Sequence, residues 1–299
     1  MKRIFLILFI MAMSATAYAG LGRVVIVTTE DLLPYDEVIK GFKSEIRDRD
    51  ITIINIKSGQ NETDLVSNML ALKPELIICI GTKALEEISK IRGVAKIFSL
   101  VNHATALRYE DRMDIAGVCL DIPSADQFKI LKKAFPELNR IGAIYDPHQN
   151  KKLMQEAERS GSILNLRLVP SPVNSIKDIP GALYKLENKI DVLWSFCDQT
   201  VYTPDTAKYI LLFSLRRNIP FVGFSPQFAK AGALIALYGD YGDMGRQAAL
   251  LVKELSETGT WQIRRVEPRR INVAINEKVA RIMRISFSES FLRTVNKIY

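Results

Sequence analysis

Residues 191–206, which read D-V-L-W-S-F-C-D-Q-T-V-Y-T-P-D-T, decide the fold. The apolar run from Val192 to Cys197 predicts a strand that is buried on both faces, as in a parallel sheet. The run ends at Asp198, and a helix is predicted next, with Thr203 as N-cap and Pro204 in its first turn. An acidic side chain therefore follows a buried strand, at the edge where open α/β sheets bind ligands. The alternative is that Asp198 only caps its own turn.

Apolar runs alternate with helical patterns on both sides of this stretch. The predicted strands span residues 23–28, 51–56, 76–80, 96–101, 115–120, 141–145, 166–169, 192–197, 220–224, 233–237 and 270–275. Strands that alternate with helices at this spacing indicate right-handed βαβ units and parallel sheets. The alternation runs through two successive sets of about five strands, which predicts an α/β protein of two Rossmann-like lobes.

The two lobes are expected to be similar in size, and each is expected to combine two separate stretches of the chain. Lobe 1 would contain residues 20–121 plus about 240–275, and lobe 2 residues 122–239 plus about 276–299. Several crossings between two lobes form a hinge, which would bring the carboxyl edges of both sheets together across a cleft. At the start of lobe 2, Ser124 is expected to cap a helix, with Gln127 completing a capping box.

The first twenty residues have the pattern of a secretory signal peptide. Lys2 and Arg3 precede an unbroken apolar run at 4–13, and residues 17–19 (A-Y-A) form a small-x-small cleavage site before Gly20. Residues 1–19 are therefore predicted to be removed on export to the periplasm. The alternative is an uncleaved anchor, although the run is short for a bilayer span. No cysteine follows the cleavage site, so no lipid anchor is expected.

Composition excludes several classes of function. The net charge is +8, and the basic residues are spread along the chain, which argues against a nucleic-acid partner. The motifs of serine hydrolases, P-loop and dinucleotide-binding proteins and zinc proteases are missing from the sequence, so no enzyme is expected. Cys79, Cys119 and Cys197 fall in apolar runs and are predicted to be buried. One disulfide, or a nucleophilic pair of Cys197 with His148, are the alternatives.

Several stretches also match a known family. In chain order they lie at residues 41–42, 76–82, 115–118, 123, 135–136, 140–142, 197–198, 219–221, 231–234 and 275–292. Together they resemble the ABC-transporter substrate-binding proteins of the tryptophan/tyrosine-binding type, over nearly the whole mature chain. The resemblance implies the type I periplasmic-binding-protein fold, a small-molecule ligand such as an amino acid, an ABC permease as partner, and a monomer without cofactor. The chain departs from the family pattern at residues 102–104, 150–151, 284 and 288.

The residues expected to bind the ligand lie at predicted strand ends. Asp198 is the candidate partner for an ammonium group, a role that the resemblance also implies. Gly81 and Thr82 begin a helix whose N-terminus could hold a carboxylate, although Gly81 could equally serve the turn alone. The further candidates are Thr29, Asn102, His103, Tyr145, Asn150, Gln199, Thr200 and Ser225. Aromatic side chains could enclose an apolar ligand group or simply form core. They are Tyr35, Tyr145, Tyr202 and Phe224.

Two alternatives to this site and function stay open. His103 and His148, with Asp146 and Asp198, could bind a metal, although lone loop histidines usually face solvent. The favoured function is the solute-binding component of an importer, which captures its ligand by hinge closure. The alternative is the same module acting as a sensor that reports ligand occupancy to a receptor.

Overall fold

The computed structural model describes residues 22–29, 32–46, 50–56 and 62–299. Contacts between Cα atoms divide the chain into two compact units. The first unit comprises the described parts of Met1–Val101, Tyr109–Val118 and Tyr241–Val266, and the second comprises Asn102–Arg108, Cys119–Asp240 and Glu267–Tyr299. The predicted signal peptide at residues 1–19 lies outside the described residues.

The first unit is built on a sheet of six strands within the described residues, in the order β11-β5-β4-β3-β1-β2. The strands are β1 (Arg23–Thr28), β2 (Asp50–Asn55), β3 (Leu76–Ile80), β4 (Ala95–Val101), β5 (Ile115–Cys119) and β11 (Arg265–Val266). The helices are α2 (Leu33–Glu45), α3 (Glu62–Ala71), α4 (Thr82–Ile88) and α11 (Tyr241–Thr258). β1 pairs in parallel with both β2 and β3, and β3 pairs in parallel with β4. The carboxyl ends of these strands therefore share one edge, as βαβ connections require.

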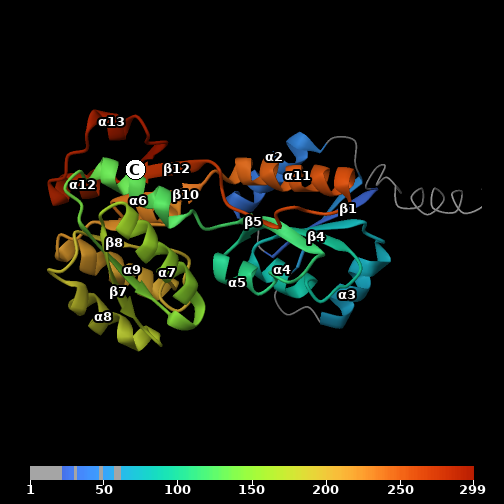
Figure 1. Ribbon diagram of the computed structural model, residues 1–299, viewed down its shortest axis with the longest axis horizontal. Coiled ribbons are helices and arrows are strands. Elements are labelled where there is room, and N and C mark those ends of the chain that lie inside the picture. The colour runs from blue at the N-terminus through green and yellow to red at the C-terminus, as the bar shows by residue number, and fades with distance from the viewer. Residues whose placement is uncertain (1–21, 30–31, 47–49, 57–61) are drawn as a thin grey trace, which may run out of the picture. The chain divides into compact units, whose positions relative to one another are not determined.

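Helices α2 and α11 lie side by side in the first unit (Figure 1). Glycines allow their backbones to approach closely, because a Cβ on Gly41 would meet the carbonyl oxygen of Gly242. A Cβ on Gly245 would likewise meet the carbonyl oxygen of Val38. The contact joins a helix near the start of the chain to one that returns after residue 240.

The second unit contains a sheet of seven strands among the described residues, in the order β13-β12-β10-β9-β8-β6-β7. The strands are β6 (Arg140–Tyr145), β7 (Arg167–Pro172), β8 (Val192–Trp194), β9 (Phe221–Gly223), β10 (Ile235–Gly239), β12 (Ile271–Ile275) and β13 (Lys297–Ile298). The helices are α5 (His103–Leu107), α6 (Ser124–Ala134), α7 (Pro147–Ile163), α8 (Ile179–Leu186), α9 (Pro204–Arg216), α10 (Pro226–Ala231), α12 (Glu277–Met283) and α13 (Glu289–Leu292), with a short 3-10 turn at Ile176–Asp178. Neighbouring strands of this sheet pair in parallel, except that β10 and β12 are antiparallel.

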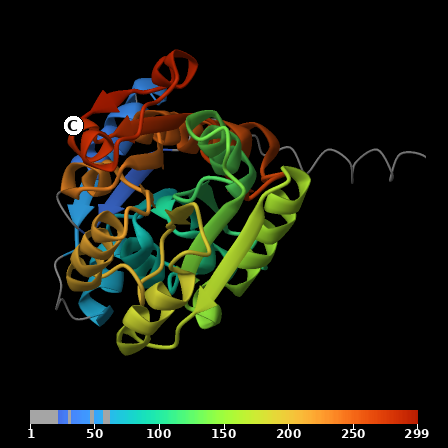
Figure 2. The same cartoon turned by 90° about the vertical axis from the view of Figure 1, so that its left-hand side faces the viewer.

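Two hydrophobic cores cover the two faces of this sheet. Figure 2 shows the helices that lie along the sheet of the second unit. One core includes Phe128 of α6, Met154 of α7 and Phe291 of α13. The other includes Leu183 of α8 and Ile210 of α9. Helices on both faces of a mostly parallel sheet make the predicted doubly wound α/β fold, which the structure confirms.

Two local expectations differ from the structure. β8 ends at Trp194 rather than Cys197, because its pairing with β6 and with β9 stops there. The Ser195 amide and hydroxyl still donate to the Val222 carbonyl, at 3.0 and 2.7 Å, before the chain turns toward Asp198. The predicted capping box at Ser124 was wrong, because the Gln127 side chain points inward. Its Nε2 donates to the Ile122 carbonyl and its Oε1 accepts from the Trp194 indole.

The strand predicted at residues 270–275 also changes the expected division between the units. This strand, β12, pairs with β10 and so joins the sheet of the second unit. The pairing places residues from Glu267 onward in the second unit, whereas lobe 1 was expected to continue to about residue 275. The chain passes between the units at residues 118/119, 240/241 and 266/267, and residues 102–108 also belong to the second unit.

Candidate functional site

The carboxylate of Asp198 follows β8 and is enclosed by donors from the protein itself. Oδ1 accepts from the backbone amides of Thr200 and Val201, both at 3.0 Å. Oδ2 accepts from the Asp146 amide at 2.8 Å and from Nδ2 of Asn150 at 2.9 Å. Asp198 is 2% exposed. Four donors occupy most of the acceptor capacity of one carboxylate, so this geometry favours the alternative in which Asp198 fixes the surrounding turns.

Asp146 follows β6 in the same way and joins that strand end to the loop after β8. Its Oδ1 accepts from the His148 amide at 2.9 Å, and its Oδ2 accepts from Thr200 Oγ1 at 2.7 Å and Gln149 Nε2 at 3.0 Å. Burial alone would raise the pKa of Asp146, but these hydrogen bonds outweigh it and the pKa is lowered. Asp146 and Asp198 therefore form one interlocked pair of turns.

Asn150 belongs to this pair because α7 is irregular there. Its backbone angles, φ −119° and ψ 20°, are not helical, and its amide still donates to the Asp146 carbonyl at 2.9 Å. The side chain, 2% exposed, reaches Asp198. The structure thus brings together three of the predicted ligand residues, Asp198, Asn150 and Thr200, in a network that is satisfied internally.

A second group of predicted residues meets around Asp121, which sequence reasoning missed. Asn102 caps α5 by accepting from the Thr105 amide at 2.8 Å. The backbone amide of His103 donates to Asp121 Oδ2 at 2.6 Å, and the Cys197 amide also donates to Asp121. Burial of the carboxylate raises the pKa of Asp121 to about 6, despite these hydrogen bonds. The segments after β4, β5 and β8 therefore converge on one carboxylate.

Asp121 predicts a pH-dependent stability. Its pKa in the folded protein, about 6, exceeds its pKa in the unfolded chain. At pH values between these two pKa values, the native state therefore binds the proton more tightly than the unfolded chain does. The stabilisation is fully present below the unfolded pKa and is lost as the pH rises through the folded pKa. We expect the free energy of unfolding of the wild type to fall by up to about 3 kcal/mol relative to Asp121→Asn between about pH 4 and about pH 7.

Urea denaturation at a series of pH values measures this difference. Asp111→Asn, which removes an exposed carboxylate from a turn of the first unit, is the matched control. Its stability should run parallel to that of the wild type across the same range. Parallel curves for Asp121→Asn as well would contradict the linkage.

In the first unit the predicted residues lie at the ends of β1 and β3. Thr29 follows β1 and is half-buried. Gly81 adopts φ 95° and ψ 156°, and its amide donates to the Ser99 carbonyl at 2.8 Å before α4 begins at Thr82. A Cβ on Gly81 would collide with the phenolic oxygen of Tyr35. Both the turn and this close approach require glycine here.

Gly81→Ala should therefore lower the free energy of unfolding by about 2–4 kcal/mol, from backbone strain and the collision with Tyr35. Gly93→Ala is the matched control, because Gly93 also has a positive φ, 77°, but a Cβ there meets nothing within 4 Å. The difference between the two losses, measured by urea denaturation, isolates the steric part. Adding Tyr35→Phe to Gly81→Ala should recover some of it, and equal losses for both glycines would contradict the steric argument.

The side chains of the remaining predicted residues form no hydrogen bond with either group among the described residues, although the Tyr202 amide donates to the Asp198 carbonyl at 2.9 Å. Gln199 is exposed, and Ser225 precedes α10 without a side-chain cap. Tyr145 ends β6, and burial followed by the charge of Glu158 raises its pKa. Tyr202 and Phe224 pack together at 5.7 Å between ring centroids, and both contact Phe228. Tyr202 and Phe224 therefore form a cluster among themselves.

A family model described as ABC transporter substrate binding protein matches residues 24–298. The chain belongs to this family. Its fold is that of solved relatives: an ABC domain in complex with L-Trp from Streptococcus pneumoniae is 16% identical, with a TM-score of 0.69 over 94% of this chain and 100% of that one.

Two further solved structures have the same fold. The ligand-free, open form of a substrate-binding protein with adhesive properties from Clostridium difficile is 16% identical, with a TM-score of 0.73 over 92% of this chain and 98% of that one. A conserved domain protein from Vibrio cholerae is 17% identical, with a TM-score of 0.68 over 94% of this chain and 100% of that one. No curated protein matches.

Family membership confirms the resemblance inferred from sequence and supports a solute-binding role alongside an ABC transporter.

All three cysteines of this substrate-binding protein are free, so a disulfide is ruled out. Burial, together with the charges of Asp121 and Asp198, raises the pKa of Cys197, which does not suit a nucleophile. No group of three or more His, Cys, Asp or Glu side chains that could hold a metal occurs among the described residues. None of the helices described is long and apolar enough to cross a membrane.

The sequence carried a pattern that would have found one of the missed carboxylates, Asp146. Asp121 and Asp146 each come directly after an apolar strand, as Asp198 does. Asp146 and Asp198 follow β6 and β8, which are parallel neighbours in one sheet, so these two acids are expected to meet. Asp121 follows β5 of the other sheet, so the same argument does not reach it. Asp146 was considered only as a possible metal ligand, and Asp121 only as a boundary of the lobes.

Proposed function

We propose that this protein is the exported solute-binding component of an ABC importer. The observation that carries the proposal is the family match over residues 24–298. The pattern of residues 1–19 supports export and cleavage before Gly20. The protein would bind a small solute and present it to the permease without changing it chemically, as a monomer.

The solute proposed is an amino acid or a similar small molecule. The L-Trp bound by the pneumococcal relative supports this class, through shared fold rather than shared residues. Because the Asp198 carboxylate is already occupied, the polar groups proposed to contact the solute include hydroxyls that form no hydrogen bond with the described residues. Thr29 after β1 and Ser225 after β9 meet this description.

The test is a thermal-shift screen of the protein recovered from the periplasm of the expressing cells. Mass spectrometry should find an N-terminus at Gly20. A solute present at a hundred times its Kd stabilises the protein by about 2.7 kcal/mol, a rise of several degrees in Tm. Ser225→Ala should keep the unliganded Tm and reduce the ligand-induced rise. A protein retained in the cytoplasm would contradict export, and the lack of a rise with every amino acid would contradict the proposed solute class.

A further inference from the structure

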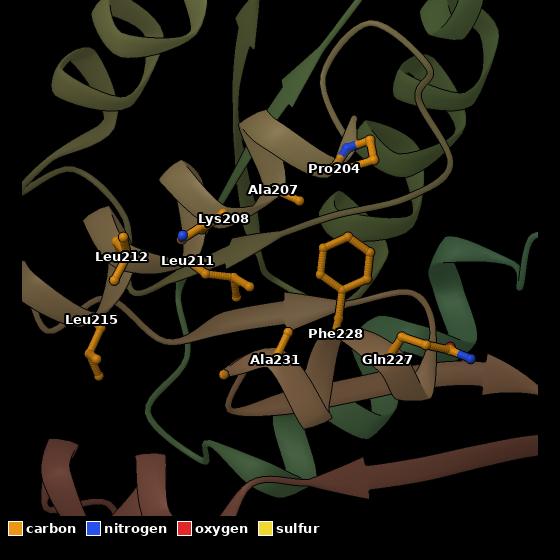
Figure 3. Close-up of a pocket in the computed structure, with 10 residues that line it drawn as sticks. Pro204, Ala207, Lys208, Leu211, Leu212, Leu215, Gln227, Phe228 and Ala231 are labelled. Atoms are coloured by element: carbon orange, nitrogen blue, oxygen red, sulfur yellow. The ribbon is translucent and has the colours of Figure 1, made fainter.

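Two helices of the second unit, α9 and α10, enclose a groove that the solute-binding function does not use. Its volume is about 540 Å³, within the range of pockets that bind small molecules. Residues from both helices line it, among them Lys208, Leu211, Leu212, Leu215, Phe228 and Ala231 (Figure 3). Its walls are helix faces within one unit, unlike the strand ends of the predicted solute site.

The groove is elongated and its lining is largely apolar. On α9 it extends from Pro204 to Leu215, a rise of about 16 Å at about 1.5 Å per residue. Leu211 is 9% exposed and forms part of the base, whereas Leu212 is 44% exposed and stands at the open side. A contiguous apolar surface of this kind on a soluble protein marks a binding site more often than a scattered exposed leucine does.

The charge around the groove is positive. Lys208 lies in the wall, and Arg216 and Lys230 belong to the same two helices. None of these three cations forms an ion pair with any residue that the structure describes. Asp205 is the one acidic residue that the sequences of α9 and α10 contain. A ligand for this groove therefore needs an apolar body and an anionic group.

We propose that the groove between α9 and α10 binds a medium-chain carboxylate. The alkyl chain lies along Leu211, Leu215 and Phe228, and the carboxylate pairs with Lys208. Length and charge both matter in this arrangement. Each added methylene that enters the groove raises affinity about fourfold, and loss of the charge pair lowers it about tenfold.

Isothermal titration of the exported protein with octanoate, dodecanoate and octan-1-ol tests the proposal. One dodecanoate should bind per chain, more tightly than octanoate, and octanoate should bind about tenfold more tightly than octan-1-ol. Ala231→Phe places a ring in the groove from an exposed position and should lower affinity for dodecanoate more than about tenfold. Lys208→Gln should lower affinity for octanoate about tenfold and leave octan-1-ol unchanged.

Lys230→Gln is the matched control, because Lys230 is an exposed cation of α10 that does not line the groove. It should change affinity less than about twofold. Binding that survives Ala231→Phe, equal effects of the two lysine variants, or no binding of dodecanoate would each overturn the proposal. So would a dimer in sedimentation that Ala231→Phe dissociates, since a second copy would then occupy the groove. Ala231→Phe should leave the rise in Tm caused by an amino acid unchanged. The test of the groove is therefore independent of the test of the proposed solute site.

Discussion

Asp114→Ala will lower the free energy of unfolding by about 3–5 kcal/mol, because it leaves a buried ammonium without its counter-ion. Lys96 of β4 is 0% exposed, and its Nζ lies 3.1 Å from Asp114 Oδ2. Nζ also donates to the Val94 carbonyl at 2.6 Å. Burial lowers the pKa of Lys96, and the hydrogen bond and charge of Asp114 act against that decrease.

Arg112 shares the same carboxylate. Its Nε donates to Asp114 Oδ1 and its Nη2 to Oδ2, both at 2.7 Å, in a bidentate arrangement. This pairing, ahead of the contribution of Lys96, lowers the pKa of Asp114 and outweighs its partial burial. The Arg112 side chain is 18% exposed, so water can solvate it when the carboxylate is removed. Lys96 has no such access, and most of the expected loss therefore arises there.

The control for Asp114 is Lys96→Met, which replaces the buried ammonium with an apolar chain of similar length. Asp114 keeps Arg112 in that variant, so we expect a loss below about 1.5 kcal/mol. The double variant should recover most of what Asp114→Ala loses. Urea denaturation measures all three, and equal losses in the single and double variants would contradict the argument.

The pH dependence of Asp114→Ala gives an independent check. The depressed pKa of Lys96 means that the unfolded chain binds more protons than the native protein between the two pKa values. Stability therefore rises with pH in that window. Without Asp114 the depression is larger, so the deficit of Asp114→Ala should shrink as the pH approaches about 10.

Much of the fold was predictable because buried parallel strands have few alternatives. Residues 76–80 are five consecutive apolar residues between Glu75 and Gly81, and all five are buried in β3 as predicted. Strand ends were less predictable, since partners distant in sequence decide them. β8 stops at Trp194 because its pairing with β6 and β9 stops there. The Gln127 side chain accepts from the Trp194 indole instead of capping the N-terminus of its helix.

The position of the candidate site was predictable from the sequence, but the hydrogen-bond partners of its residues were not. Asp198 lies where the strand pattern predicted, but its four donors come from residues 146, 150, 200 and 201, and two of these become neighbours only when β6 and β8 pair. Lys96 looked like the start of an apolar strand, and its burial depends on Asp114, which arrives from another segment. Spacing along the chain carries no information about such contacts.

Asp198→Ala should lower the free energy of unfolding by about 4 kcal/mol or more, with or without a solute. The substitution leaves the amides of Asp146, Thr200 and Val201 and the side chain of Asn150 without their acceptor. Each unsatisfied buried donor costs about 1–3 kcal/mol, although the losses in one network do not simply add. Urea denaturation of the unliganded protein measures the effect.

Gln199→Ala is the matched control for Asp198, because Gln199 is the exposed neighbour in the same turn. Its loss should stay within about 0.5 kcal/mol. The loss for Asp198→Asn should fall between those of Asp198→Ala and Gln199→Ala. The asparagine keeps one acceptor oxygen, but its NH2 group would face two of the donors. If Asp198 were instead held for the ammonium of a solute, Asp198→Ala would leave the unliganded stability within about 1 kcal/mol and abolish only the ligand-induced rise in Tm. The four hydrogen bonds that Asp198 accepts from the protein itself argue for the first outcome.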